Sequence, residues 1–186
     1  MPFVGIISKI KDYEFIKNKI VKDSMNNKIE LININKNNVE NIKNVKFEAI
    51  FVCDDLQDMQ TQKTYIDNIL NCSKYLVINT DNNVVNINIE NNNMEIITYG
   101  MNQKATVTAS SIKEDEILIC LQRNIENING KVIEMQEFKK KGEKIRNEEI
   151  YIILAAFILE QIYNWKIFTF FNKFNILCRQ NEKNVL

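Results

Sequence analysis

The sequence predicts an α/β fold, in which a mostly parallel, Rossmann-like sheet of the phosphate-loop type is flanked by helices. Short runs that are apolar on both faces recur as far as Asn79, and segments with apolar side chains at helical spacing separate them. Further on, an Asn-Gly pair at 129–130 between two strand-like segments indicates a hairpin, so we expect a small antiparallel patch near 95–139. The 186 residues suit one domain, 1–186.

The first half of the chain supplies the predicted parallel strands. They are the apolar runs at 3–7, 29–34, 49–53 and 75–79. Apolar residues three or four positions apart predict helices around 13–20 and 65–70, and a short helix at 39–42. Strands that are apolar on both faces and alternate with helices indicate a parallel sheet covered on both sides.

The second half has a different pattern. Residues 95–99 are extended, and apolar and hydroxyl side chains alternate over 105–110, as in a half-exposed strand. The segments 116–122 and 131–138 flank the Asn-Gly turn. A lysine-rich link at 139–142 then leads into a long buried helix that begins near Asn147 and continues through 150–171.

Composition excludes several function classes. The chain has 24 basic and 24 acidic residues, which argues against the electrostatic footprint of a nucleic-acid-binding protein. It contains no His, so imidazole is unavailable as a metal ligand or general base. Its four Cys lack metal-ligand spacing, and we expect reduced thiols and a cytoplasmic location. Polar residues such as Glu160 interrupt 150–171, so we expect a buried helix and no membrane span.

Five short motifs follow one another in a familiar order. They are the opening strand with the segment 8–13, Asp54-Asp55-Leu56 after the third strand, Asn79-Thr80-Asp81 after the fourth, Thr98-Tyr99-Gly100, and Ala155-Ala156 followed at a distance by Arg179. Together they resemble the central, ATP-binding domain of the Mur ligases, which join amino acids to peptidoglycan precursors through an acyl-phosphate. The resemblance implies that domain alone, without the N- and C-terminal domains of the family.

The same comparison implies that the catalytic site is lost. Asp12 stands where the family has the Lys of its phosphate loop, and Ser8 and Lys11 replace loop glycines. A carboxylate facing a triphosphate at low dielectric is repulsive by kcal/mol amounts. Asp55 replaces a metal-binding His, and no Lys occurs between Tyr65 and Ser73, where the family carries its metal-bridging Lys. We therefore expect no cofactor and no bound metal.

Candidate ligand-binding residues remain at the predicted strand ends. They are Asp54, Asp55, Asn79 and Asp81, together with Arg179 from the last motif. In open α/β sheets, ligands bind at the carboxyl ends of the strands. As alternatives, the Asp residues after the third strand cap the next turn or helix, and Asn79 and Asp81 form an Asx turn. Asp54, Asp55 and Asp58 are also suitable oxygen ligands for a hard cation.

Four functional hypotheses follow. The first is a non-catalytic binding or assembly module, linked through family likeness to cell-wall metabolism. The second is a protein that binds a nucleotide or a UDP-sugar precursor without turnover. The third is a residual ATP-dependent ligase, or an enzyme that uses the carboxylates Asp54 and Asp55 alone. The fourth is a structural protein bound to a partner or to itself, with a homodimer expected because 150–171 has more apolar residues than one buried stripe requires.

Overall fold

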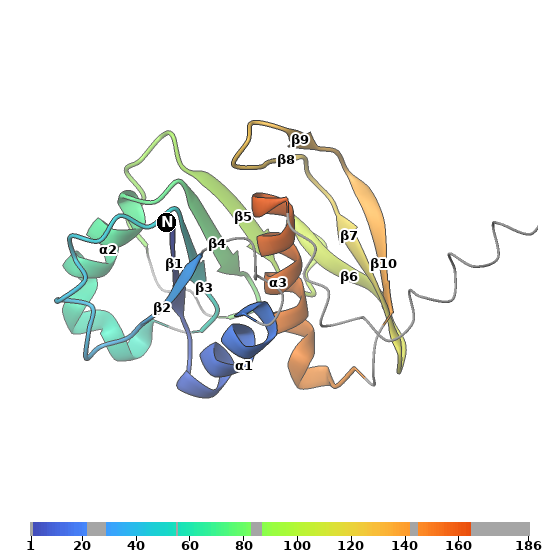
Figure 1. Ribbon diagram of the computed structural model, residues 1–186, viewed down its shortest axis with the longest axis horizontal. Coiled ribbons are helices and arrows are strands. Elements are labelled where there is room, and N and C mark those ends of the chain that lie inside the picture. Colours follow the sequence, from blue (N-terminus) through green and yellow to red (C-terminus); the bar gives the residue numbers. More distant parts are fainter. Residues whose placement is uncertain (1, 22–28, 55, 83–86, 142–144, 165–186) are drawn as a thin grey trace, which may run out of the picture.

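An eight-stranded mixed sheet forms the framework of the computed structural model, which describes residues 2–21, 29–54, 56–82, 87–141 and 145–164 (Figure 1). The strand order is β10-β7-β6-β5-β4-β3-β1-β2. The strands are β1 (Phe3–Ile7), β2 (Glu30–Ile34), β3 (Ala49–Val52), β4 (Tyr75–Asn79), β5 (Glu95–Tyr99), β6 (Val107–Ile112), β7 (Glu116–Leu121) and β10 (Gln136–Lys141). The strands β8 (Ile125–Glu126) and β9 (Val132–Ile133) form a separate antiparallel pair. The predicted α/β class is confirmed.

The parallel part of the sheet runs from β2 through β1, β3, β4 and β5 to β6. β1 pairs with β2 on one side and β3 on the other. All four residues of β3 are buried, because helices or loops cover both faces of this part. β5 is parallel to β4, so the parallel part continues into the 95–139 region, and the antiparallel pairs begin between β6 and β7.

Three α-helices are described: α1 (Ile10–Val21), α2 (Lys63–Asn71) and α3 (Ile150–Tyr163). Two short 3-10 helices, η1 (Gln57–Gln62) and η2 (Asn147–Glu149), precede α2 and α3. α1 and α3 lie side by side over one face of the sheet, and α2 belongs to the core on the other face (Figure 1). The helical periodicity around 13–20 and 65–70 is thus confirmed by α1 and α2.

The short helix expected at 39–42 is wrong, because residues 36–44 form a series of turns. Asparagine side chains replace the helical pattern there. Asn38 Nδ2 donates to the carbonyl of Asn33 at 2.7 Å, and Asn38 Oδ1 accepts from the N–H of Asn35 at 2.9 Å. Such side chain to backbone bonds compete with helix formation, while Val39 still reaches the core.

The lysine-rich segment at 139–142 also differs from its prediction as a link. Lys139, Lys140 and Lys141 belong to β10, and they pair with Leu118, Ile117 and Glu116 of β7. The ion pair between Lys139 Nζ and Glu116 Oε2, 2.8 Å apart, explains how a charged segment is held as a strand.

The helix expected over 150–171 begins at Ile150 and ends at Tyr163. Asn164 follows with a left-handed φ of 53°, which closes the helix. The residues expected to extend it to 171 lie outside the described part of the chain. α3 is buried on nearly all sides, and even Glu160 is 6% exposed, with its Oε2 2.7 Å from Lys140 Nζ. Among the described residues, no helix has the length and apolarity to cross a bilayer.

Candidate functional site at the carboxyl edge

The sheet has a topological switch point between β1 and β3. From β1 the chain moves to β2 on one side, and it then returns to β3 on the other side. Connections that diverge in this way leave a crevice at the carboxyl ends of the two strands, where ligands of open α/β sheets bind. The residues at this point are Ser8 and Lys9 after β1, and Cys53 and Asp54 after β3.

The turn between β1 and α1 is short and internally bonded. Ser8 and Lys9 alone separate the end of β1 from the start of α1. The backbone N–H groups of Asp12 and Tyr13 both donate to the carbonyl of Lys9 at 3.0 Å, and Asn33 Nδ2 donates to the carbonyl of Ser8 at 3.4 Å. A phosphate loop instead needs several consecutive residues whose N–H groups converge on the anion.

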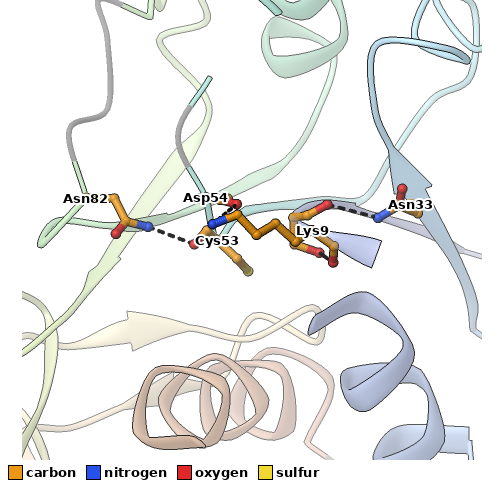
Figure 2. Close-up of polar contacts among 6 residues, drawn as sticks. Lys9, Asn33, Cys53, Asp54 and Asn82 are labelled. Carbon is orange, nitrogen blue, oxygen red and sulfur yellow. Dashed lines mark hydrogen bonds and ion pairs between the residues drawn. The ribbon is translucent and has the colours of Figure 1, made fainter. Parts of the chain in front are cut away.

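An ion pair spans the switch point. Lys9 Nζ lies 3.5 Å from Asp54 Oδ2, and the side chains are 67% and 28% exposed (Figure 2). Beside it, Asn82 Nδ2 donates to the carbonyl of Cys53 at 2.8 Å, which ties the segment after β4 to the end of β3. An amide, a carboxylate and an accessible ammonium group are therefore gathered at the ends of neighbouring strands.

Asp81 connects three other parts of this edge. Its Oδ2 accepts hydrogen bonds from the N–H of Met101 and, at 3.1 Å, from the hydroxyl of Tyr151 on α3. A Cβ added to Gly100 would lie 2.8 Å from Asp81 Oδ1, so the carboxylate occupies the space that glycine leaves open. Asn79 is buried, and its Oδ1 accepts from the N–H of Asp81 at 3.1 Å, which forms the Asx turn of the alternative interpretation.

The carboxyl edge also holds a thiol and a phenol that the sequence reasoning missed. Cys53 directly follows β3, and Tyr99 is the last residue of β5. Burial raises the pKa of the Cys53 thiol to about 12; a hydrogen bond from Tyr99 lowers it in part, and the nearby Asp12 and Asp54 carboxylates raise it further. Burial also raises the pKa of Tyr99 well above its usual value. Cys53 therefore remains a thiol at neutral pH and cannot act as a nucleophile in this state. Their positions at the ends of two apolar strands were the sequence signal that could have placed both residues at this edge.

The predicted ligand residues do not form one cluster. Asp54 faces Lys9, whereas Asp81 faces the turn after β5 and α3. Asp55 and Arg179 lie outside the residues that the structure describes. Within the described ranges, no group of three or more Cys, Asp and Glu residues is placed to hold a metal ion.

A second concavity lies deeper, between α1, α3 and the sheet. It is lined by Val4, Ile6, Ile16, Phe51, Ala155, Ala156 and Leu159. Ligand pockets combine apolar walls with a few polar groups that orient the ligand, and none of these side chains is polar. The concavity is therefore better explained as a packing gap in the core, where the paired alanines leave space between the helices.

Comparison with protein families and with curated proteins adds no relative from which a role could be transferred. No protein-family model matches the chain, and no curated protein matches it either. The geometry of the carboxyl edge is therefore the basis for the function proposed below.

Proposed function

We propose that the chain is a non-catalytic domain of the Mur-ligase type that acts as a binding or assembly module beside cell-wall metabolism. The main support for a non-catalytic role is the two-residue turn between β1 and α1, followed by Asp12 in the first turn of α1. A nucleotide triphosphate would have to bind where the chain offers neither a loop nor a cationic helix start.

Electrostatics supports the same conclusion. A carboxylate in the first turn of a helix interacts favourably with the helix dipole, and Asp12 holds this place at α1. An incoming phosphate would meet like charge there and would compete with an interaction that the protein already makes. The ammonium group of Lys9 is drawn toward Asp54 on the neighbouring strand. The charged groups of the site are therefore paired with one another or with the helix dipole, as expected for a domain that keeps its fold but no longer binds a nucleotide.

Isothermal titration with Mg-ATP tests this proposal. We expect no binding heat from the wild-type protein, and none from Asp12→Asn, because the short turn remains when the charge is removed. Micromolar binding to the wild-type chain, or ATP turnover by it, would overturn the proposal. Binding by Asp12→Asn alone would show that charge, and not loop length, closes the site.

A second candidate is a protein that binds a small polar ligand at the switch point without turnover. The favouring observation is the accessible Lys9 ammonium beside Asp54 and the Asn82 amide, a donor and acceptor set that suits a nucleotide or a UDP-linked sugar. A thermal-shift screen of these compounds tests it. Ligand at one hundred times its Kd should add about 2.7 kcal/mol to the unfolding free energy.

The chain offers a matched control for that screen. Lys113 is also 67% exposed, and its Nζ lies 3.6 Å from Glu116 Oε1 in the antiparallel part of the sheet. Lys9→Ala should abolish a thermal shift that Lys113→Ala retains. Equal loss in both variants would point to nonspecific attraction of an anion, and a screen without any shift would remove this candidate.

A further inference from the structure

The two edges of the sheet differ in whether their outward backbone groups are satisfied. At β2, the N–H of Glu30 donates to the carbonyl of Pro2, so Glu30 faces inward. Since backbone groups alternate along a strand, Leu31 and Asn33 face outward. Tyr13 Oη donates to the carbonyl of Leu31 at 2.8 Å, and Asn38 Nδ2 donates to that of Asn33 at 2.7 Å. Side chains thus occupy the outward acceptors of β2.

The opposite edge, β10, differs: among the residues that the structure describes, its outward groups have no such partners. The N–H of Gln122 donates to the carbonyl of Thr106, so the backbone groups of Gln122 point toward β6. Because these groups alternate along β7, those of Ile119 point toward β10. Its partner Phe138 therefore faces β7, and Glu137, Lys139 and Lys141 face outward. Within the described part of the chain, no backbone or side-chain group bonds to the outward N–H and carbonyl groups of these three residues.

We propose that β10 pairs with β10 of a second copy, antiparallel and around a two-fold axis at Phe138, so that the two eight-stranded sheets become continuous. This register places Glu137 opposite Lys139 of the second copy, and Lys139 opposite Glu137 of the second copy. The next register that pairs outward residues would centre on Lys139; it would also pair Glu137 with Lys141, but it would set two Lys139 side chains against each other at its centre. The charge order along β10 therefore selects the first register.

The charge distribution on that face also favours a second copy. Lys113, Lys139 and Lys141 all place their Nζ within 3.7 Å of the same carboxylate, Glu116. These lysines hold the pKa of Glu116 below its usual value, with Lys139 the largest cause. Three lysines share the single carboxylate of Glu116. Glu137 of a second copy would bring a further carboxylate to Lys139.

The edge at β2 is closed, in the sense that side chains occupy its outward carbonyl groups, and this explains why the assembly would stop at two copies. An assembly continues only when each added copy presents another open edge, and here the remaining edges would both be β2. The inference supplies a partner for the assembly role proposed above. A chain that bound Mg-ATP could still form this pair, so the two proposals fail in separate experiments.

Sedimentation velocity at micromolar concentration, with charge reversals, tests the pair. We expect a wild-type dimer, monomers for Glu137→Lys and for Lys139→Glu, and a restored dimer when both are combined. Glu30→Lys, on the closed edge, is the matched control and should leave the dimer unchanged. A monomeric wild type, or a dimer lost in Glu30→Lys but kept in Glu137→Lys, overturns the proposal.

A backbone variant separates strand pairing from general charge attraction. Lys139→Pro removes an outward N–H together with the Lys139 ammonium and leaves the bonds between β10 and β7 in place, whereas its control Lys139→Gln removes the ammonium alone. We expect Lys139→Pro to sediment as a monomer with a circular dichroism spectrum close to wild type, and Lys139→Gln to retain part of the dimer. A folded Lys139→Pro dimer would exclude pairing through β10.

Discussion

Strands β3 and β7 illustrate how differently the two halves of the sheet are built. Every residue of β3 is buried, whereas β7 alternates between buried residues under α3 and half-buried residues on the other face. On that other face, Ser110 Oγ of β6 donates to the carbonyl of Leu118 in β7 and to Glu137 Oε1 in β10, both at 3.3 Å. The parallel half is thus stabilised by apolar burial on two faces, and the antiparallel half combines one apolar face with a polar one.

Truncation of core residues should give the largest difference between the halves. Ile50→Ala in β3 removes a fully buried side chain and should cost about 2–5 kcal/mol of unfolding free energy. Leu118→Ala, on the half-buried face of β7, should cost roughly 1 kcal/mol. Urea unfolding measures both, and equal losses would contradict the distinction.

Asparagine clusters allow a second comparison. The side chain of Asn71, the last residue of α2, makes four hydrogen bonds. Its Nδ2 donates to the carbonyl of Asp67 in the same helix and to that of Asn88 in the segment before β5, and its Oδ1 accepts from the N–H groups of Glu90 and Asn91 in that segment. Asn71→Ala should therefore cost about 2–3 kcal/mol, because several groups lose their partners.

The antiparallel half supplies the counterpart, Asn127. Its Oδ1 accepts from the N–H groups of Asn129 and Lys131 within the hairpin. Asn127→Ala should cost about 1–2 kcal/mol, less than Asn71→Ala, because fewer bonds are lost. Thermal unfolding of the two variants checks the order, and hydrogen exchange should locate the damage at Glu90 and Asn91 in one case and at Lys131 in the other.

The parallel half should also lose stability at alkaline pH through Cys53. Its folded pKa of about 12 lies above the ordinary thiol value of 9.0. The unfolded thiol therefore ionises first, so this contribution is complete below about pH 9 and falls by about 1.4 kcal/mol per pH unit as the pH rises toward 12. The difference in unfolding free energy between wild type and Cys53→Ser should decrease between about pH 9 and pH 12. A difference that stays constant over this range would refute the raised pKa of Cys53.

The smallest effects should come from the two exposed ion pairs. Lys9→Ala in the parallel half and Lys113→Ala in the antiparallel half should each change stability by about 0–1 kcal/mol. Urea unfolding of both variants in low and high salt measures this. A loss of several kcal/mol for Lys9→Ala would mean that the pair at the switch point holds the fold, and its role in ligand binding would lose support.

The elements of the parallel half could be predicted because local pattern and burial agree there. The runs that became β1, β3 and β4 are apolar on both faces, and nearly all of their residues are buried in the sheet. At 36–44 the same reasoning failed, because the apolar spacing of Val39 and Ile42 competes with asparagine amides that bond to the backbone. Short segments lack the length to outweigh such local bonds.

The candidate site was less predictable, because its contacts join residues that are distant in the chain. Asp54 could be placed at a strand end from the sequence, yet its partner Lys9 depends on which strand lies next to β3. The hydrogen bond from Tyr151 to Asp81 spans 70 positions, and it required the placement of α3 over the sheet. The lysine-rich strand depends on similar distant contacts, since Lys139 and Lys141 pair with Glu116 in β7 and Lys140 pairs with Glu160 in α3.

The hydroxyl of Tyr13 has a consequence beyond the fold of one molecule. It sits on a helix, yet it fills an acceptor at the rim of the sheet. In Tyr13→Phe the carbonyl of Leu31 would lose its partner while the rest of α1 stays packed, and Asn38 would still occupy the carbonyl of Asn33. If the chain pairs through β10 as proposed, this freed carbonyl gives such pairs a further point of strand contact, and Tyr13→Phe should sediment partly as species larger than a dimer.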